Sequence, residues 1–320
     1  YMDDLLLSLA SQTYKQFKVI ISDDSPDNAV TKRVTELRKQ GLPSNIAITV
    51  VEGPKQGSMA NIVHLLNMWN ASTPLLHVLC DDDMIYPLFY QKHLAAHQQQ
   101  ALSTSVSYRW ISNEAGFPIE NPQIPAFVNK TQTSNVVLDA ADLFNSTIPY
   151  CFNWLGEVSN CVFSRNIALQ LKDQSMAGIV YNGLGDIGLI LQGALQGKTA
   201  IIKEHLGAFR LSPHQNTGNL NSISFQCGYV AWIALALSAY QLRQINLQQA
   251  QQCISAINQT LLNRFAEVPT LLAIAQLPQH YNLADEDYKI AFTRLWNELL
   301  AQDKSWMTAI KIKQEVLVEA

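Results

Sequence analysis

Three consecutive aspartates, Asp81, Asp82 and Asp83, follow a mostly apolar run that begins at Leu75, and this junction limits the possible folds more than any other stretch. The run is typical of a buried β-strand, and a buried strand tolerates no unpaired charge. We therefore expect the three carboxylates at the carboxyl end of that strand. In open α/β sheets, the crevice outside the carboxyl ends of the strands is where ligands bind.

The acidic junction admits two interpretations. Adjacent carboxylates repel one another, and a hard divalent cation among them relieves that repulsion, so the cluster suits a metal-and-phosphate site. Alternatively, the aspartates form an acidic turn before the helix that starts near Pro87, because acidic side chains stabilise helix N-termini.

A second acidic cluster favours the ligand site. Asp23, Asp24 and Asp27 follow a β-branched run over residues 17–22, which we interpret as another strand. Helical and strand patterns alternate through this part of the chain, which predicts a mostly parallel sheet flanked by helices. Two strands then bring acidic clusters to one edge of the sheet, whereas a capping role for one cluster requires no second cluster facing it.

The remaining elements of this α/β part follow from hydrophobic periodicity and from turn residues. The first predicted helix starts at Tyr1, and the others cover residues 28–40, 58–69 (with Ser58 as N-cap), about a dozen residues through His93 and His97, 138–144, 166–171 and 187–195. The predicted strands cover residues 17–22, 46–51, 75–79, 104–111, 158–164 and 199–202, with a loop or flap over 117–137.

Composition narrows the class of protein. The chain has 320 residues, of which 48% are hydrophobic, so it can bury a substantial core. Its formal net charge is -4 without a basic block, which argues against nucleic acid as a partner. The five cysteines show no CxxC spacing, which argues against a disulfide framework and favours a reducing, cytoplasmic location. No run approaches the ~20 apolar residues of a membrane span, since the longest candidate, residues 229–240, is too short.

The sequence pattern changes after residue 221, from alternating helices and strands to helices alone. Patterns rich in Leu, Ala and Gln predict helices over residues 225–242, 247–265, 268–277 and 285–300. We therefore divide the chain into an α/β catalytic domain, residues 1–221, and an all-α extension, residues 222–320. The extension contains no catalytic constellation, and we expect it to pack on the catalytic domain, to bind a partner or to form an oligomer.

Six stretches of the chain resemble, in the same order, motifs of the family 2 glycosyltransferases. They are the opening helix, strand and acidic turn (Tyr1–Asp27), a Gly-x-x-x-Asn helix start (Gly57–Asn61), the place of the metal-binding Asp-x-Asp motif (Cys80–Pro87), an acidic turn with glycine (Asn113–Gly116), the helix start that carries the catalytic carboxylate (Leu184–Asp186), and a late Arg/His segment (Phe209–His214).

The resemblance implies a GT-A fold and transfer of a sugar from a nucleotide-sugar donor, with a UDP-sugar favoured. It also implies Mn²⁺ or Mg²⁺ as cofactor and a hydroxyl of a glycan, lipid-linked or protein acceptor, as in polysaccharide biosynthesis. Peripheral association with the inner face of a membrane is compatible with this role. The first strand of the family is absent from this sequence, and we expect it to precede Tyr1 in a longer protein.

The resemblance also implies roles for individual residues. Asp186 is the expected general base, with inversion at the anomeric carbon; Asp82 and Asp83 are the expected metal ligands; and the donor is expected to contact Asp23, Asp24, Asn61, Asp81, Arg210 and His214.

Three positions depart from the family pattern. Cys80 replaces the first aspartate of the metal motif, Gly185 replaces a glutamate before the catalytic carboxylate, and Ser212 stands where the late histidine is usual. The departures at Cys80 and Gly185 support an alternative in which the chain is a catalytically degenerate scaffold or interaction module. A nucleotidyltransferase also uses strand-end aspartates and a metal, but the sequence lacks the glycine-rich phosphate loop that such an enzyme requires.

Several candidates also have a structural interpretation. Asp186 could be the N-cap of the helix over residues 187–195, and Asp23 and Asp24 could form an Asx turn before Pro26. Trp154 could stack on an acceptor sugar or be an ordinary buried aromatic residue.

Overall fold

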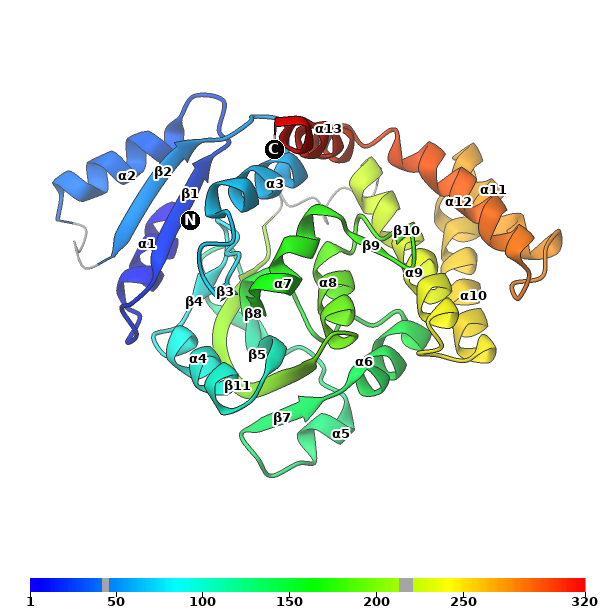
Figure 1. The fold of residues 1–320 in the computed structure, drawn as a ribbon, viewed down its shortest axis with the longest axis horizontal. Coiled ribbons are helices and arrows are strands. Elements are labelled where there is room, and N and C mark those ends of the chain that lie inside the picture. The colour runs from blue at the N-terminus through cyan, green and yellow to red at the C-terminus, as the bar shows by residue number, and fades with distance from the viewer. Residues whose placement is uncertain (42–45, 213–220, 320) are drawn as a thin grey trace.

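The computed structural model describes residues 1–41, 46–212 and 221–319. It is an α/β fold in which a central sheet is flanked by helices, as predicted, with further helices at one side (Figure 1). The chain opens with the predicted alternation of α1 (Met2–Ala10), β1 (Lys18–Asp23), α2 (Ala29–Lys39), β2 (Ala47–Glu52) and α3 (Ser58–Trp69).

The strands form a large sheet and two small ones. The large sheet has the order β3 (Leu75–Leu76), β8 (Cys161–Ser164), β5 (Leu102–Ser112), β11 (Lys198–Arg210) and β4 (Met84–Ile85), with β6 (Pro118–Glu120) beside β5 and β7 (Asn135–Leu138) beside β11.

Parallel pairing dominates the two longest ladders. β1 pairs in parallel with β2 from Lys18 opposite Ala47 to Asp23 opposite Glu52, and β5 pairs in parallel with β11. The short strands β3, β4, β6, β7 and β8 add antiparallel pairs around this centre. Two further short strands, β9 (Ser175–Met176) and β10 (Ile179–Val180), form an antiparallel hairpin.

Three strand predictions require correction. The strand before the aspartates spans only β3, because the following backbone turns to the loop around Ser159: the Cys80 N–H donates to Ser159 Oγ at 3.0 Å, and His77 Nε2 lies 2.9 Å from the Ser159 carbonyl oxygen. The predicted flap over residues 117–137 contains β6, a short helix and most of β7. The last strand, β11, is 13 residues long and continues through Arg210.

Helices cover the sheet and form the C-terminal part. Those of the α/β part are α4 (Phe89–Gln99), α5 (Ala126–Asn129), α6 (Ala140–Thr147), α7 (Arg165–Ala168) and α8 (Gly185–Ala194); those that follow are α9 (Ile223–Gln241), α10 (Leu247–Arg264), α11 (Pro269–Gln276), α12 (Glu286–Leu300) and α13 (Lys304–Glu319).

The most apolar helix, α9, corrects the expectation that no segment is long enough for a membrane span. By length and composition α9 would be sufficient, but 67% of its most apolar window is buried inside the protein. Its hydrophobic character is therefore accounted for by its place in the core.

One hydrophobic cluster extends from Met59 on α3 to Ala309 on α13 and includes residues of α8, α9, α10 and α12. This cluster crosses the predicted boundary at residue 221, so the helical extension packs into the core of the α/β part. At its far end the chain returns to the α/β part, where α13 lies against α3 (Figure 1).

Candidate active site

The three aspartates form a turn in which each side chain has a different environment. The Asp83 N–H donates to the Cys80 carbonyl at 3.2 Å, and the buried Asp83 carboxylate accepts the backbone N–H of Arg210 at 3.1 Å. Burial and the nearby charge of Asp82 raise the pKa of Asp83 to about 7, against the hydrogen bonds that it accepts. Asp82 is partly exposed and Asp81 is exposed.

An ion pair that the sequence analysis did not anticipate lies beneath this turn. Arg109 on β5 donates from Nη2 to Glu157 Oε1 at 3.0 Å, and its Nε contacts the second carboxylate oxygen. Only 7% of the Arg109 side chain and 21% of the Glu157 side chain are exposed. Gly156 has a φ of +100°, and a Cβ there would lie 2.5 Å from Arg109 Cζ, so the close approach requires glycine.

Asp186 lies in the first turn of α8, whose N-cap is Leu184, so the hypothesis that Asp186 is itself the N-cap is wrong. Its removal from water and the charge of Glu157 raise the pKa of Asp186 to about 6, while the Asp186 and Ile187 N–H groups and Arg109 act in the opposite direction. The charge of Glu157 also contributes to the raised pKa of Asp83. Asp186 and the acidic turn therefore flank the same Arg109–Glu157 pair.

The residues expected on the donor side lie at the end of β1 and the start of α3. Asp24 Oδ1 accepts the backbone N–H of Lys55, and Asn61 Oδ1 accepts Ser22 Oγ, both at 2.5 Å. The structure thus brings Asp24 and Asn61 to neighbouring positions at one end of the β1–β2 ladder.

Asp23 is engaged within its own turn. Its two carboxylate oxygens accept from the backbone and hydroxyl groups of Ser25 and Thr31. Burial opposes ionisation, but these hydrogen bonds outweigh it and lower the pKa of Asp23 to about 2. This geometry matches the structural interpretation of Asp23, which holds β1 to the start of α2.

Arg210 directs its side chain toward α1. Its guanidinium donates to Asp4 Oδ2 at 3.0 Å and to the Glu114 carbonyl at 3.1 Å, and it lies 4.6 Å from the centre of the Tyr1 ring. The side chain is buried, and the Arg210 backbone N–H donates to Asp83 in the acidic turn. His214 lies outside the described residues.

A divalent cation fits this site only when substrate phosphates supply part of its coordination. Within the part of the chain that the structure describes, no three His, Cys, Asp or Glu side chains converge to hold a metal. Asp81 is exposed and Asp82 is partly exposed, whereas the buried Asp83 accepts the Arg210 N–H. Mg²⁺-type sites commonly use one or two carboxylates and complete their coordination with substrate phosphates and water. Asp82, assisted by Asp81, fits that pattern.

The sequence carried a weak signal for the residues that were missed. Ser105, Ser107 and Arg109 occupy alternate positions of a mostly buried strand, and a charge in such a strand requires a buried partner. Nothing in the sequence identified that partner as Glu157. Trp154 is 2% exposed and donates to Ser146 Oγ at 3.2 Å, so it is a buried aromatic residue and offers no face for stacking on a sugar.

Comparison with known proteins gives a likeness in structure alone. No protein-family model and no curated protein matches the sequence. The crystal structure of S. aureus TarS 1-349 in complex with UDP-GlcNAc superposes with a TM-score of 0.52 at 13% identity, covering 98% of this chain and 88% of that one. The same protein in complex with UDP gives a TM-score of 0.51 at 15% identity, with the same coverage. This chain therefore has the fold of TarS 1-349 over nearly its whole length.

Proposed function

We propose that this protein is a glycosyltransferase that moves a sugar from a nucleotide-sugar donor to an acceptor hydroxyl, with Asp186 as general base and with inversion at the anomeric carbon. The observation that carries this proposal is the convergence of Asp186 and the acidic turn on the Arg109–Glu157 pair. This arrangement supports a site in which a basic carboxylate acts near carboxylates suited to a metal-bound diphosphate.

The chemistry of each residue fits the reaction. The acceptor oxygen attacks the anomeric carbon as its proton passes to the Asp186 carboxylate, and the bond to the diphosphate breaks with its electron pair on the leaving nucleoside diphosphate. A pKa of about 6 leaves Asp186 ionised at neutral pH but more basic than an ordinary aspartate. The negative charge of Glu157 helps to keep the pKa of Asp186 raised, and the positive charge of Arg109 offsets part of the repulsion between these two carboxylates.

The donor is proposed to lie between β1 and the acidic turn. Asp24 and Asn61 would contact the base and ribose, and Asp82 with Asp81 would hold Mn²⁺ or Mg²⁺ on the phosphates. When bound, the cation offsets the negative charge that grows on the leaving diphosphate. The likeness to TarS, solved with UDP-GlcNAc and with UDP, favours a UDP-sugar as donor. The proposed acceptor is a hydroxyl group of a glycan, lipid-linked or protein acceptor.

The test is thermal unfolding with UDP, GDP, CMP and dTDP, each with Mn²⁺ and with a chelator. A ligand that binds only the native state raises the melting temperature by mass action. We expect a shift with UDP that requires Mn²⁺ and disappears in Asp82→Ala, together with turnover of the matching UDP-sugar. No shift with any nucleotide, or an equal shift in Asp82→Ala and wild type, would contradict the proposed site.

A scaffold without catalysis is the second candidate, and one observation favours it. Arg210 and Asp83, which the family pattern assigns to the donor and metal, are occupied by contacts within the protein. Asp186→Asn separates the two functions, because it removes the base but keeps the shape of the side chain. Loss of turnover with a melting temperature no lower than that of the wild type would reject the scaffold.

A further inference from the structure

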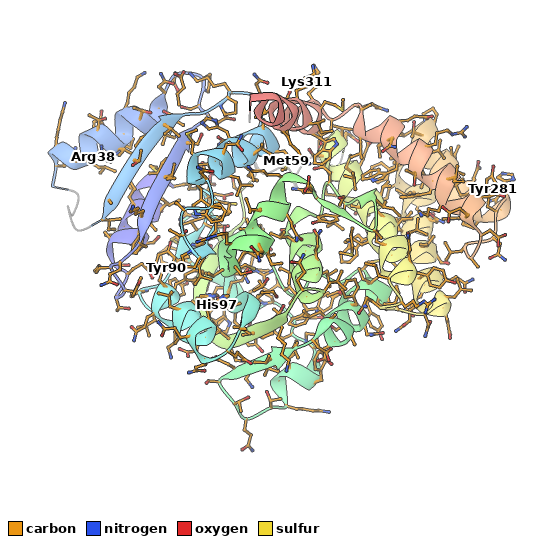
Figure 2. The ribbon with its side chains drawn as sticks, viewed as in Figure 1. Arg38, Met59, Tyr90, His97, Tyr281 and Lys311 are labelled. Carbon is orange, nitrogen blue, oxygen red and sulfur yellow. The ribbon has the colours of Figure 1, made fainter. Side chains whose placement is uncertain are left out.

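The start of α3 lacks an N-cap of its own. The N-cap position is Gly57, not the predicted Ser58, and no side chain of the segment caps the helix. Ser305, 246 positions further along the chain, lies in the first turn of α13, and its Oγ accepts the Met59 N–H at 3.1 Å. A side-chain oxygen on the second or third N–H of a helix is the usual capping contact. Here α13 supplies it from outside the helix; Figure 2 labels Met59 on α3 and Lys311 on α13.

Gly57 is shaped by this approach. A Cβ at this position would lie 2.7 Å from Ser305 Oγ and 2.9 Å from Ser305 Cβ, and the φ of Gly57 is +99°. Both the conformation and the space therefore require glycine. The glycine of the Gly-x-x-x-Asn motif at the start of α3 is therefore required for the contact with α13.

The same turn of α13 also holds the segment that leads to Asp186. Asp303 accepts the N–H groups of Ser305 and Trp306 at 3.0 and 3.2 Å with one oxygen, and accepts Asn182 Nδ2 at 3.1 Å with the other. Asp303 is 5% exposed and Asn182 7% exposed, so water competes little for this bond. Asn182 lies just before Gly185, where α8 begins.

Three hydrogen bonds, connected through short stretches of the chain, therefore link the two sides of the site. Ser22 on β1 bonds to Asn61 on α3, Met59 on α3 bonds to Ser305, and Asp303 bonds to Asn182. The donor-side residues lie at one end of this set, and Asp186 lies at the other.

A second, shorter link runs in parallel. Gln174 donates from Nε2 to Met59 Sδ at 3.0 Å, and the same nitrogen lies 2.8 Å from where a Cβ of Gly185 would be. Gln174 thus occupies the space next to Gly185, where the family pattern has a glutamate, and connects α3 to the start of α8.

We propose that Asp303 and Ser305 are positioning residues of the active site, which fix the start of α3 relative to Asp186. This inference rests on the proposed function. Hydrophobic packing of α13 stabilises the fold, but it tolerates small sliding movements. Directional hydrogen bonds to two helix starts restrict those movements, and a displacement of about 1 Å between reacting groups can reduce the rate about a hundredfold.

The test compares Ser305→Ala and Asn182→Ala with wild type in steady-state turnover of UDP-GlcNAc with Mn²⁺, at a temperature where all variants are folded. Loss of one capping bond corresponds to about a fivefold change in an equilibrium. We expect Ser305→Ala to raise the donor KM about fivefold with kcat nearly unchanged. We expect Asn182→Ala to lower kcat about tenfold, with little change in donor KM and with a displaced acidic limb of the pH profile.

Two further variants separate positioning from general destabilisation. Lys311→Ala changes an exposed residue of the same helix and should leave both kinetic constants at the wild-type values. Ser305→Thr keeps the hydroxyl and should restore the donor KM. Hydrogen exchange gives a direct check, since the Met59 amide should exchange faster in Ser305→Ala and not in Lys311→Ala.

The outcomes distinguish the two proposals. If wild type turns over donor while Ser305→Ala and Asn182→Ala match Lys311→Ala, the positioning role is wrong and the glycosyltransferase function stands. If Ser305→Thr behaves like Ser305→Ala, the capping bond is not the cause. If wild type shows neither turnover nor a metal-dependent shift with UDP, the proposed function fails, and the positioning role fails with it.

Discussion

The Arg109 guanidinium is paired with the Glu157 carboxylate in the interior, between the acidic turn and the start of α8. Arg109 is 7% exposed, so its charge depends on this partner. Removing one member of a buried pair leaves an uncompensated charge, which typically costs about 3 kcal/mol or more.

Glu157→Gln should therefore lower the free energy of unfolding by about 3 kcal/mol, measured by urea denaturation. The control is Lys289→Ala, which removes a surface ion pair with Glu286 and should cost less than about 1 kcal/mol. A double variant, Glu157→Leu with Arg109→Leu, should recover much of the loss, because neither charge then remains buried. A Glu157→Gln variant as stable as Lys289→Ala would contradict the assignment of a buried pair.

The pH dependence of turnover should follow Asp186. A general base acts in its ionised form, so activity should fall as the pH drops through the pKa of Asp186, which is about 6. Glu157 is one cause of that raised pKa, so Glu157→Gln should move the acidic limb of kcat/KM to lower pH. The pH–rate profiles of the two proteins, measured where both are folded, check this shift. Coincident acidic limbs would show that Glu157 does not act on the base.

The contribution of Asp186 to stability should depend on pH in the direction opposite to that of turnover. The pKa of Asp186 is higher in the folded protein than the ordinary value near 3.9. The folded state therefore binds a proton that the unfolded state releases, and the contribution of Asp186 to stability declines as the pH rises from about 4 to about 6. Asp186→Asn should remove this decline in a series of melts from pH 4 to pH 7.

Asp23 and Asp24 should separate into a structural and a donor-binding residue. The pKa of Asp23 is lowered to about 2, so its stabilising contribution is present above about pH 4 and is lost as the pH falls toward 2. Asp23→Asn places an amide group against the Thr31 donors and should cost about 2 kcal/mol at pH 7. Asp24→Asn should change the melting temperature little but weaken the UDP-dependent shift. Equal effects of the two substitutions on stability would contradict this division.

Much of the fold could be predicted because helices and strands leave local signals. The alternation through α3 follows from hydrophobic periodicity, and the C-terminal helices follow from long amphipathic patterns. The strand before the aspartates was overestimated because an apolar run records burial, whereas pairing is decided by partners distant in sequence. The Cys80 N–H, for example, donates to the Ser159 hydroxyl, a contact that no local sequence pattern predicts.

The carboxylates of the candidate site could be proposed from the sequence, but the contacts that hold the site together could not. Asp82 follows from the acidic run after an apolar segment, and Asp186 from its position at a helix start, which sequence patterns locate. The Arg109–Glu157 pair and the cap from Ser305 join residues 48 and 246 positions apart. Such contacts depend on tertiary packing, and a single sequence contains no covariation from which to infer them.

Asp83 should prove a structural residue of the acidic turn. Its buried carboxylate accepts the Arg210 N–H at 3.1 Å, which joins the turn to β11. Asp83→Leu leaves that N–H without an acceptor in the interior and should cost about 2 kcal/mol in urea denaturation, whereas Asp83→Asn keeps an acceptor and should cost less. Asp83→Asn should also retain the Mn²⁺-dependent shift with UDP, because Asp82 is still partly exposed. Loss of that shift in Asp83→Asn, with stability maintained, would instead assign Asp83 to the metal, because only a ligand role makes the negative charge itself indispensable.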